Sequence, residues 1–92
     1  MIVLFRYGKG RDMTTVTMQH AVGTTLRTMR TDQGRSLKHV AAAAFTTHSH
    51  LAYIERGIKQ PGSELLWDIC CALEVPLSSV LEQAITMLDD EN

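Results

Sequence analysis

From residue 19 onward, apolar positions recur mostly at spacings of three and four, which is the repeat of a helix that buries one face. Glycine, proline and short polar breaks interrupt the pattern and divide it into five segments. We therefore predict an all-α domain of five helices, over about residues 19–33, 36–44, 47–55, 63–75 and 77–88. In the first of these, Val22, Leu26 and Met29 form the expected buried stripe, and Gly34 is expected to end it in a left-handed conformation.

The second and third segments lie within residues 36–57 and carry the most informative pattern. Their apolar or small positions at helical spacing are Leu37, Val40, Ala41 and Ala44, followed after a break by Leu51 and Ile54. Ser36 can cap the first of these helices, either Thr46 or Thr47 the second, and Gly57 stops the run. Two short helices joined by a tight turn predict a helix-turn-helix, whose second helix can enter the major groove of DNA.

The last two segments are expected to support this unit. Ser63 is expected to cap the fourth helix. The fifth has an apolar stripe broader than a five-helix body needs, so we expect Leu81, Ile85 and Leu88 to form the interface of a homodimer. Residues 89–92 read as a frayed acidic tail, because acidic groups at a helix C-terminus oppose the helix dipole.

Residues 1–18 combine a short apolar run with basic residues between glycines. Three interpretations are open: a strand that pairs with a second copy, a basic arm that reaches along DNA, or a weakly ordered extension. We favour the extension, because glycines and chain termini seldom hold structure unaided. The expected organisation is thus an extension over 1–18 and a helix-turn-helix domain over 19–92.

Charge is strongly segregated along the chain, although the net charge is only −1. Residues 1–60 hold all nine lysines and arginines against three acidic residues, whereas residues 61–92 hold seven acidic residues and no lysine or arginine. A basic half beside an acidic half suits a protein that faces phosphate with one side and solvent or a partner with the other.

The sequence offers little for catalysis or metal binding. His48 and His50 are two residues apart, which turns them to different faces of a helix, whereas zinc on helices requires spacings of three or four and further ligands. The adjacent Cys70 and Cys71 cannot build a disulfide framework, which fits a reducing cytoplasm, and a DNA-binding protein there would associate with the nucleoid. No nucleophile–base pair, paired carboxylate or phosphate-binding glycine loop is recognisable, so we expect neither an enzyme nor a cofactor.

Residues 36–57, with "IERG" at 54–57 and "QPGSELLWDICCALEVPLSSVL" at 60–81, resemble the helix-turn-helix of the Cro-type phage repressors, the XRE family. Within that family the chain is most similar to the actinobacterial Clp gene regulators, through "GRSL", "SELL", "IC" and "ALEVPLSSVL". The resemblance runs without a gap over roughly Val22 to Ala84 and implies a lambda-repressor-like fold. It departs at the turn, where the family usually has Gly or a polar residue and then Val or Ile. Here Phe45 and Thr46 stand there, and a bulky residue where positive φ is needed is uncommon.

The resemblance and the chemistry of the side chains together indicate a DNA-contacting set. His48, Ser49 and Tyr53 match the family's base-contacting positions and carry groups that can read base edges. For phosphate contact the sequence offers a cap hydroxyl and four cations around the motif, namely Thr47, Arg35, Lys38, Arg56 and Lys59. Glu55 matches a family glutamate that is usually structural.

We therefore expect a homodimeric transcriptional regulator that binds an inverted repeat in double-stranded DNA. The subfamily resemblance implies control of protein quality-control genes, as an activator. Two alternatives stay open: an antitoxin or restriction-controller protein of the same fold, and a protein-interaction module that has lost DNA binding. The acidic second half would suit a protein partner, whereas the cations around the motif favour DNA.

Overall fold

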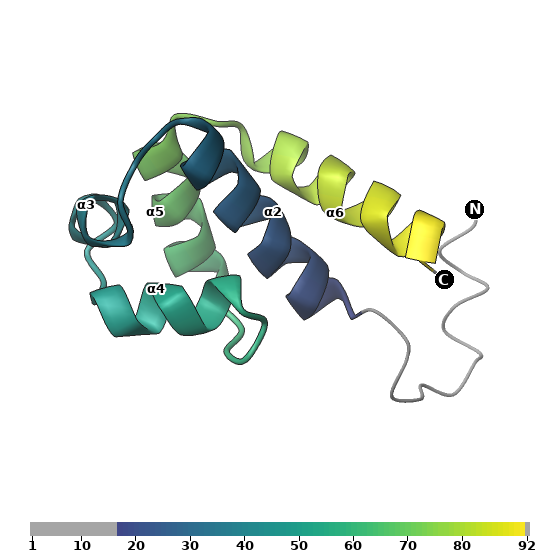
Figure 1. The fold of residues 1–92 in the computed structure, drawn as a ribbon, viewed down its shortest axis with the longest axis horizontal. Coiled ribbons are helices and arrows are strands. Elements are labelled where there is room, and N and C mark those ends of the chain that lie inside the picture. The colour runs from purple at the N-terminus through teal and green to yellow at the C-terminus, as the bar shows by residue number, and fades with distance from the viewer. Residues whose placement is uncertain (1–16, 92) are drawn as a thin grey trace.

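The structure is a computed structural model that describes residues 17–91, with the side chain of residue 91 left undescribed. This part of the chain contains helices and no strand, as predicted (Figure 1). The helices are α2 (Met18–Asp32), α3 (Leu37–Ala43), α4 (His48–Glu55), α5 (Ser63–Leu73) and α6 (Leu77–Glu91). Residues 1–16 of the predicted extension lie outside the described residues.

Three of the helices begin at a side-chain cap. The hydroxyls of Thr17, Ser36 and Thr47 accept from the backbone N–H three residues on, at 3.1, 3.0 and 3.0 Å. The cap of the fourth expected helix is different. Gly62 is the N-cap of α5 and makes no side-chain cap hydrogen bond, while Ser63 is already helical. The prediction of a Ser63 cap was wrong, because the Gly62 carbonyl accepts the first helical bond, from the Leu66 N–H at 2.9 Å.

The connections between helices use left-handed residues. Gly34 has a φ of 70° after α2, as predicted, and Glu74 has a φ of 58° at the end of α5. In the turn between α3 and α4, Phe45 adopts a φ of 61°. This turn is therefore built with a bulky residue in a conformation that glycine takes at no steric cost.

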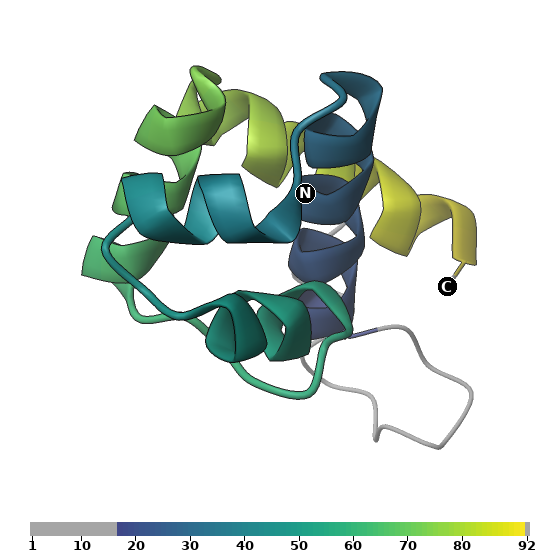
Figure 2. The same ribbon diagram turned by 60° about the vertical axis from the view of Figure 1, so that its left-hand side comes forward.

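A single core joins all five helices of residues 17–91. Leu26 on α2, Leu51 and Ile54 on α4, Ile69 on α5 and Val80 on α6 are fully buried. Helix α2 lies at the centre, with α6 along one side and α4 across its N-terminal half, while α3 packs on α4 and α5 (Figures 1 and 2). The helix-turn-helix is thereby held at one end of the molecule.

Gly23 on α2 allows α4 to approach very closely. A Cβ added to this glycine would lie 2.2 Å from the Ile54 carbonyl oxygen and 3.0 Å from that of Glu55. No ordinary side chain fits in that space, so the backbone at the end of α4 rests directly on α2. The hydrophobic repeat does not reveal this contact.

Helix α6 is longer than expected. It continues through Asp89 and Asp90 to Glu91, so the prediction of a frayed tail from residue 89 was wrong for these positions. Met87 and Leu88 pack against the core just before the acidic residues and support the last turn. No helix within residues 17–91 has both the length and the apolar character that crossing a membrane requires.

Candidate nucleic-acid interface

Helix α4 shows one buried and one exposed face. Leu51 and Ile54 have no exposed surface, whereas His48 and Ser49 are exposed and Tyr53 keeps 43% of its surface open to solvent. This is the arrangement that the spacing predicts. The three candidate base readers therefore share the exposed face of α4. This helix lies at one end of the molecule (Figure 1).

The N-terminus of α4 is open to an incoming anion. Thr47 is exposed, and its hydroxyl caps the helix by accepting from the His50 N–H. The first turn of a helix carries N–H groups without helical partners and a partial positive charge, both of which attract phosphate. Thr47 thus lies where a phosphate oxygen could be held beside the exposed face.

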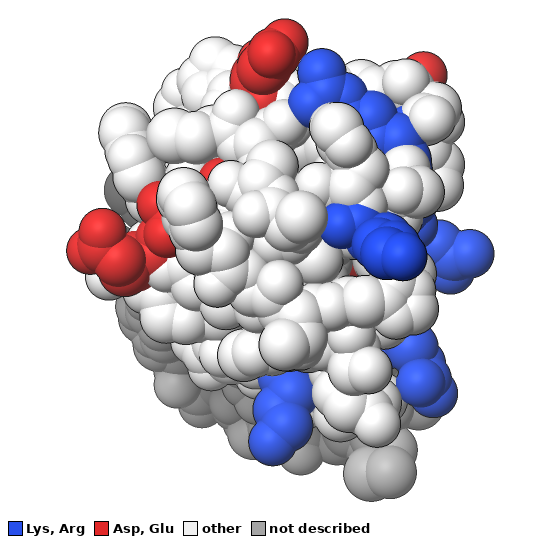
Figure 3. Space-filling view, turned by 90° about the vertical axis from the view of Figure 1, so that its left-hand side faces the viewer, with Lys and Arg blue, Asp and Glu red and all other residues white. Residues whose placement is uncertain are grey.

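Three of the four predicted phosphate-binding cations are exposed around this face. They are Lys38 on α3, Arg56 at the end of α4 and Lys59 in the following loop. Within residues 17–91 none of them takes part in an ion pair or a side-chain hydrogen bond. Figure 3 shows this end of the molecule, with basic side chains mainly along the right-hand side and at the bottom, and acidic side chains at the left and the top.

Arg35 does not join this set. Its guanidinium donates from Nη1 to the Ala72 carbonyl oxygen near the end of α5 and lies 3.6 Å from the Glu74 carboxylate. It is therefore engaged by the C-terminal end of α5, where carbonyl oxygens attract cations. Arg35 thus ties the loop before α3 to α5, and its phosphate contact stays a prediction.

A buried ion pair that the sequence analysis did not identify fixes the end of α4. Arg30 Nε and Nη2 donate to Glu55 Oε2 and Oε1 at 2.7 and 3.0 Å, and the two side chains are only 11% and 4% exposed. Arg30 Nη1 also donates to the Arg35 carbonyl oxygen at 2.8 Å. This bidentate pair joins α2 to α4 and orients the face that carries the candidate base-reading residues. Glu55 thus has the structural place that the family resemblance implies.

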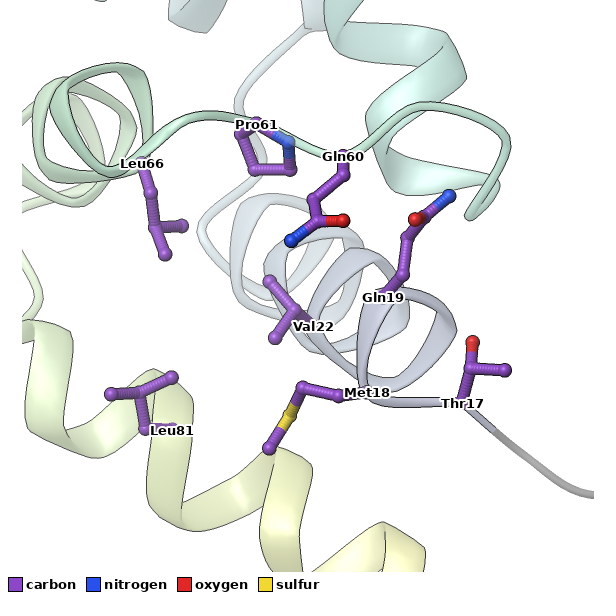
Figure 4. Close-up of a pocket in the computed structure, with 8 residues that line it drawn as sticks. All are labelled: Thr17, Met18, Gln19, Val22, Gln60, Pro61, Leu66 and Leu81. Atoms are coloured by element: carbon purple, nitrogen blue, oxygen red, sulfur yellow. The ribbon is translucent and has the colours of Figure 1, made fainter. Parts of the chain in front are cut away.

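The α6 residues expected at a dimer interface divide into two kinds. Leu81 and Leu88 are half-buried and pack against the core, whereas Ile85 is half-buried without being part of that packing. Leu81 also lines an open hollow of about 350 Å³ between α2, α5 and α6, with Met18 across from it (Figure 4). Ile85 is thus the residue of the three that is most available to a second copy.

The described residues hold no cluster of three or more His, Cys, Asp or Glu side chains that could bind a metal ion. Cys70 is buried and Cys71 is exposed, and both are free thiols. Burial, and then the charge of Cys71, raise the pKa of the Cys70 thiol, so Cys70 is a neutral core residue.

Two short helices of this geometry, capped and crossed inside a five-helix core, define a lambda-repressor-like helix-turn-helix domain. The helix-turn-helix family model HTH_3 matches residues 26–80, more than half of the chain. The chain therefore belongs to this XRE-type helix-turn-helix family, and the resemblance stated from the sequence is confirmed.

Its curated relatives include the transcriptional regulator ClgR of two strains of Mycobacterium tuberculosis, which is 48% identical over 67 residues. That match covers 73% of this chain and 60% of the relative, so the chain spans well under the full length of these proteins. A crystal structure of the clp gene regulator ClgR from Corynebacterium glutamicum superposes with a TM-score of 0.79 at 33% identity, covering 82% of this chain and 80% of that one.

The restriction-modification controller protein C.AhdI from Aeromonas hydrophila has the same fold, with a TM-score of 0.66 at 22% identity over 67% of this chain and 94% of its own. This chain is thus a helix-turn-helix domain related to ClgR regulators.

Proposed function

We propose that this chain is a transcriptional regulator that binds a specific double-stranded DNA sequence as a homodimer. The observation that carries the proposal is the outer face of α4: exposed donor and acceptor side chains beside an open helix N-terminus, bordered by exposed cations. Phosphate contacts set the position of a protein on the duplex, and contacts with base edges provide the sequence preference.

The reading set is His48, Ser49 and Tyr53. His48 and Ser49 lie in the first turn of α4, which reaches deepest when this helix enters the major groove. Imidazole can donate to guanine N7 or O6, and a serine hydroxyl can donate or accept with several bases. Tyr53 lies just over one turn further on and can contact the groove wall or the next base pair.

The phosphate set is Thr47, Lys38, Arg56 and Lys59. These residues come from the first turn of α3, both ends of α4 and the following loop, so they lie on several sides of the reading set. Exposed cations that are not engaged within the domain can release counterions from DNA when they bind phosphate.

A single α4 contacts too little DNA for specific regulation, which is why the proposal includes a dimer. A two-fold dimer would place its two reading helices about one helical turn apart, roughly 34 Å. The half-buried Ile85 supports this arrangement, because it is an apolar side chain of α6 that is not among those packed against the core. The names of the relatives point to clp genes as the targets, and we include these genes in the proposal.

The test is a selection of random duplexes by the purified protein at near-physiological salt, read by sequencing. Enrichment of an inverted repeat with centres about ten base pairs apart is the expected result. Absence of enrichment, with binding that disappears as salt rises, would leave only nonspecific attraction to phosphate and would refute the proposal.

A further inference from the structure

Phe45, in the turn between α3 and α4, is the most exposed large apolar residue of the described chain, with 88% of its surface open to solvent. Its φ of 61° is a left-handed conformation that bulky residues rarely adopt. The ring therefore contributes nothing to the core, and a phenylalanine is sterically unfavourable in this backbone conformation. Stability of the domain gives no reason for a phenylalanine at this position.

The turn itself does not need the ring. The Phe45 N–H donates to the Ala42 carbonyl oxygen at 3.2 Å, and the Thr46 N–H donates to that of Ala41 at 2.9 Å. Both hydrogen bonds are made by the main chain, so a glycine could make them without strain. A side chain that the fold neither buries nor requires is a candidate for contact with another molecule.

The position of Phe45 indicates which molecule. It lies two residues before Thr47, the N-cap of α4, and two residues span at most about 7 Å. The ring is therefore within reach of whatever the first turn of α4 contacts. The exposed residues next to it on α3 are Ala42 and Ala43, which offer far less apolar surface than the centre of a protein interface.

We propose that Phe45 contacts the duplex beside the first turn of α4, an inference that rests on the proposed function. The ring would pack against a thymine methyl group at the edge of the major groove, which is the apolar feature that this groove displays. Phe45 is then a specificity-determining residue that adds a thymine preference to the sequence read by α4. It would add no dependence on salt, because the ring is uncharged.

The test uses the full chain and the duplex enriched by the selection described above. Each thymine is replaced in turn by deoxyuridine, which lacks only the methyl group, and affinities are measured by fluorescence anisotropy. The affinity of the wild-type chain should fall about fourfold when one particular thymine of each half-site is replaced, because that is the contribution of one buried methyl group. Phe45→Gly should bind the original duplex correspondingly more weakly and show no further loss at that thymine, with an unchanged salt dependence.

Two further variants isolate the ring. Phe45→Ala removes the ring but keeps the left-handed strain, so it should show the same DNA phenotype as Phe45→Gly. Trp67→Ala removes another exposed aromatic side chain, 55% exposed on α5, and should leave affinity and deoxyuridine sensitivity unchanged. Thermal unfolding should show that Phe45→Gly melts no lower than the wild type, since glycine relieves the strained φ.

Unchanged affinity and unchanged deoxyuridine sensitivity in Phe45→Gly would overturn this inference while leaving the proposed function intact, and would point to a protein contact for the ring. Failure of the wild-type chain to enrich any duplex would overturn the proposed function, and this inference with it.

Discussion

At the scale of single residues, His48 and Lys38 should contribute to DNA binding in different ways. Both side chains are exposed around α4, but His48 lies in the first turn of the reading helix and Lys38 on α3. His48→Ala should weaken the free energy of binding to the preferred duplex by about 1–3 kcal/mol and relax discrimination at one base pair. Lys38→Ala should weaken binding to all duplexes alike and reduce the salt slope by about one. Binding isotherms on preferred and scrambled duplexes at several salt concentrations distinguish the two, and an equal loss on every sequence for His48→Ala would remove it from the reading set.

The Arg30–Glu55 pair gives a residue-scale prediction for stability. Both side chains are almost fully buried, so removing one partner leaves a charge without compensation. Glu55→Ala should lower the free energy of unfolding by about 3–5 kcal/mol. Replacing both residues together, as Arg30→Met with Glu55→Leu, should cost less than either single change, because no buried charge remains. Urea unfolding of Glu55→Ala, of the single changes Arg30→Met and Glu55→Leu and of the double variant measures this. A loss in the double variant equal to the sum of its two single losses would show that the side chains are not coupled.

The exposure of the candidate base readers could be predicted from the sequence, but the contacts of the arginines could not. Helical spacing decides which side of a helix a residue occupies, and that was sufficient for His48 and Tyr53. It does not say which other helix lies opposite. Arg30 and Arg35 therefore could not be assigned to Glu55 and to the end of α5, since these contacts join residues 25 and 37 positions apart.

At the scale of elements, the crossing of α2 and α4 depends on Gly23. Gly23→Ala would place a methyl group against the Ile54 and Glu55 carbonyl oxygens, so the two helices would have to separate. We expect a loss of about 1–3 kcal/mol in the free energy of unfolding and weaker specific DNA binding, because α4 would shift relative to the core. Gly62→Ser is the matched control: its site has open space, and serine is a preferred N-cap, so stability should be unchanged or slightly higher. Equal thermal stability of Gly23→Ala and the wild type would contradict the close approach.

The positions of the helices were predicted well from the sequence, whereas the residues at which they begin and end were predicted less well. Spacing and breaks located all five helices of residues 17–91, and the caps at Ser36 and Thr47 were among those expected. The start of α5 and the end of α6 differed. At α5, the N-cap is Gly62, whose carbonyl accepts the first helical hydrogen bond without a capping side chain. At α6, packing of Met87 and Leu88 outweighs the unfavourable acidic end. The end of α6 depends on tertiary packing that a local pattern does not contain, whereas the start of α5 depends on which of two adjacent residues takes the N-cap position.

At the scale of the whole molecule, the proposed dimer depends on α6 surface that the core leaves uncovered. Ile85→Asp should abolish dimerisation without unfolding the domain, because this side chain is not part of the core packing. Affinity for an inverted repeat should then fall by at least tenfold, whereas binding to a single half-site should remain. The matched control is Glu82→Gln, an exposed position on the same helix. Analytical ultracentrifugation reports the oligomeric state, and a dimer that survives Ile85→Asp would place the interface elsewhere.

The division of charge along the chain has a counterpart in three dimensions. The exposed cations Lys38, Arg56 and Lys59 lie on α3, at the end of α4 and in the following loop, whereas most of the acidic residues within 17–91 belong to α5 and α6. An orientation that brings α4 to DNA therefore turns much of the acidic surface away from the phosphates. This follows from the fold, because α2 separates α4 from α6 (Figure 1).

The most direct test of α4 as the DNA-reading face is a two-dimensional ¹H–¹⁵N NMR titration of the labelled protein with its selected duplex. The largest shifts should fall on the amides of Thr47, His48 and Ser49, with smaller changes at Lys38 and Lys59. A scrambled duplex should affect the cation-bearing segments alone. Shifts concentrated on the outer face of α5 around Trp67, with none in the first turn of α4, would contradict the account and place the binding surface elsewhere.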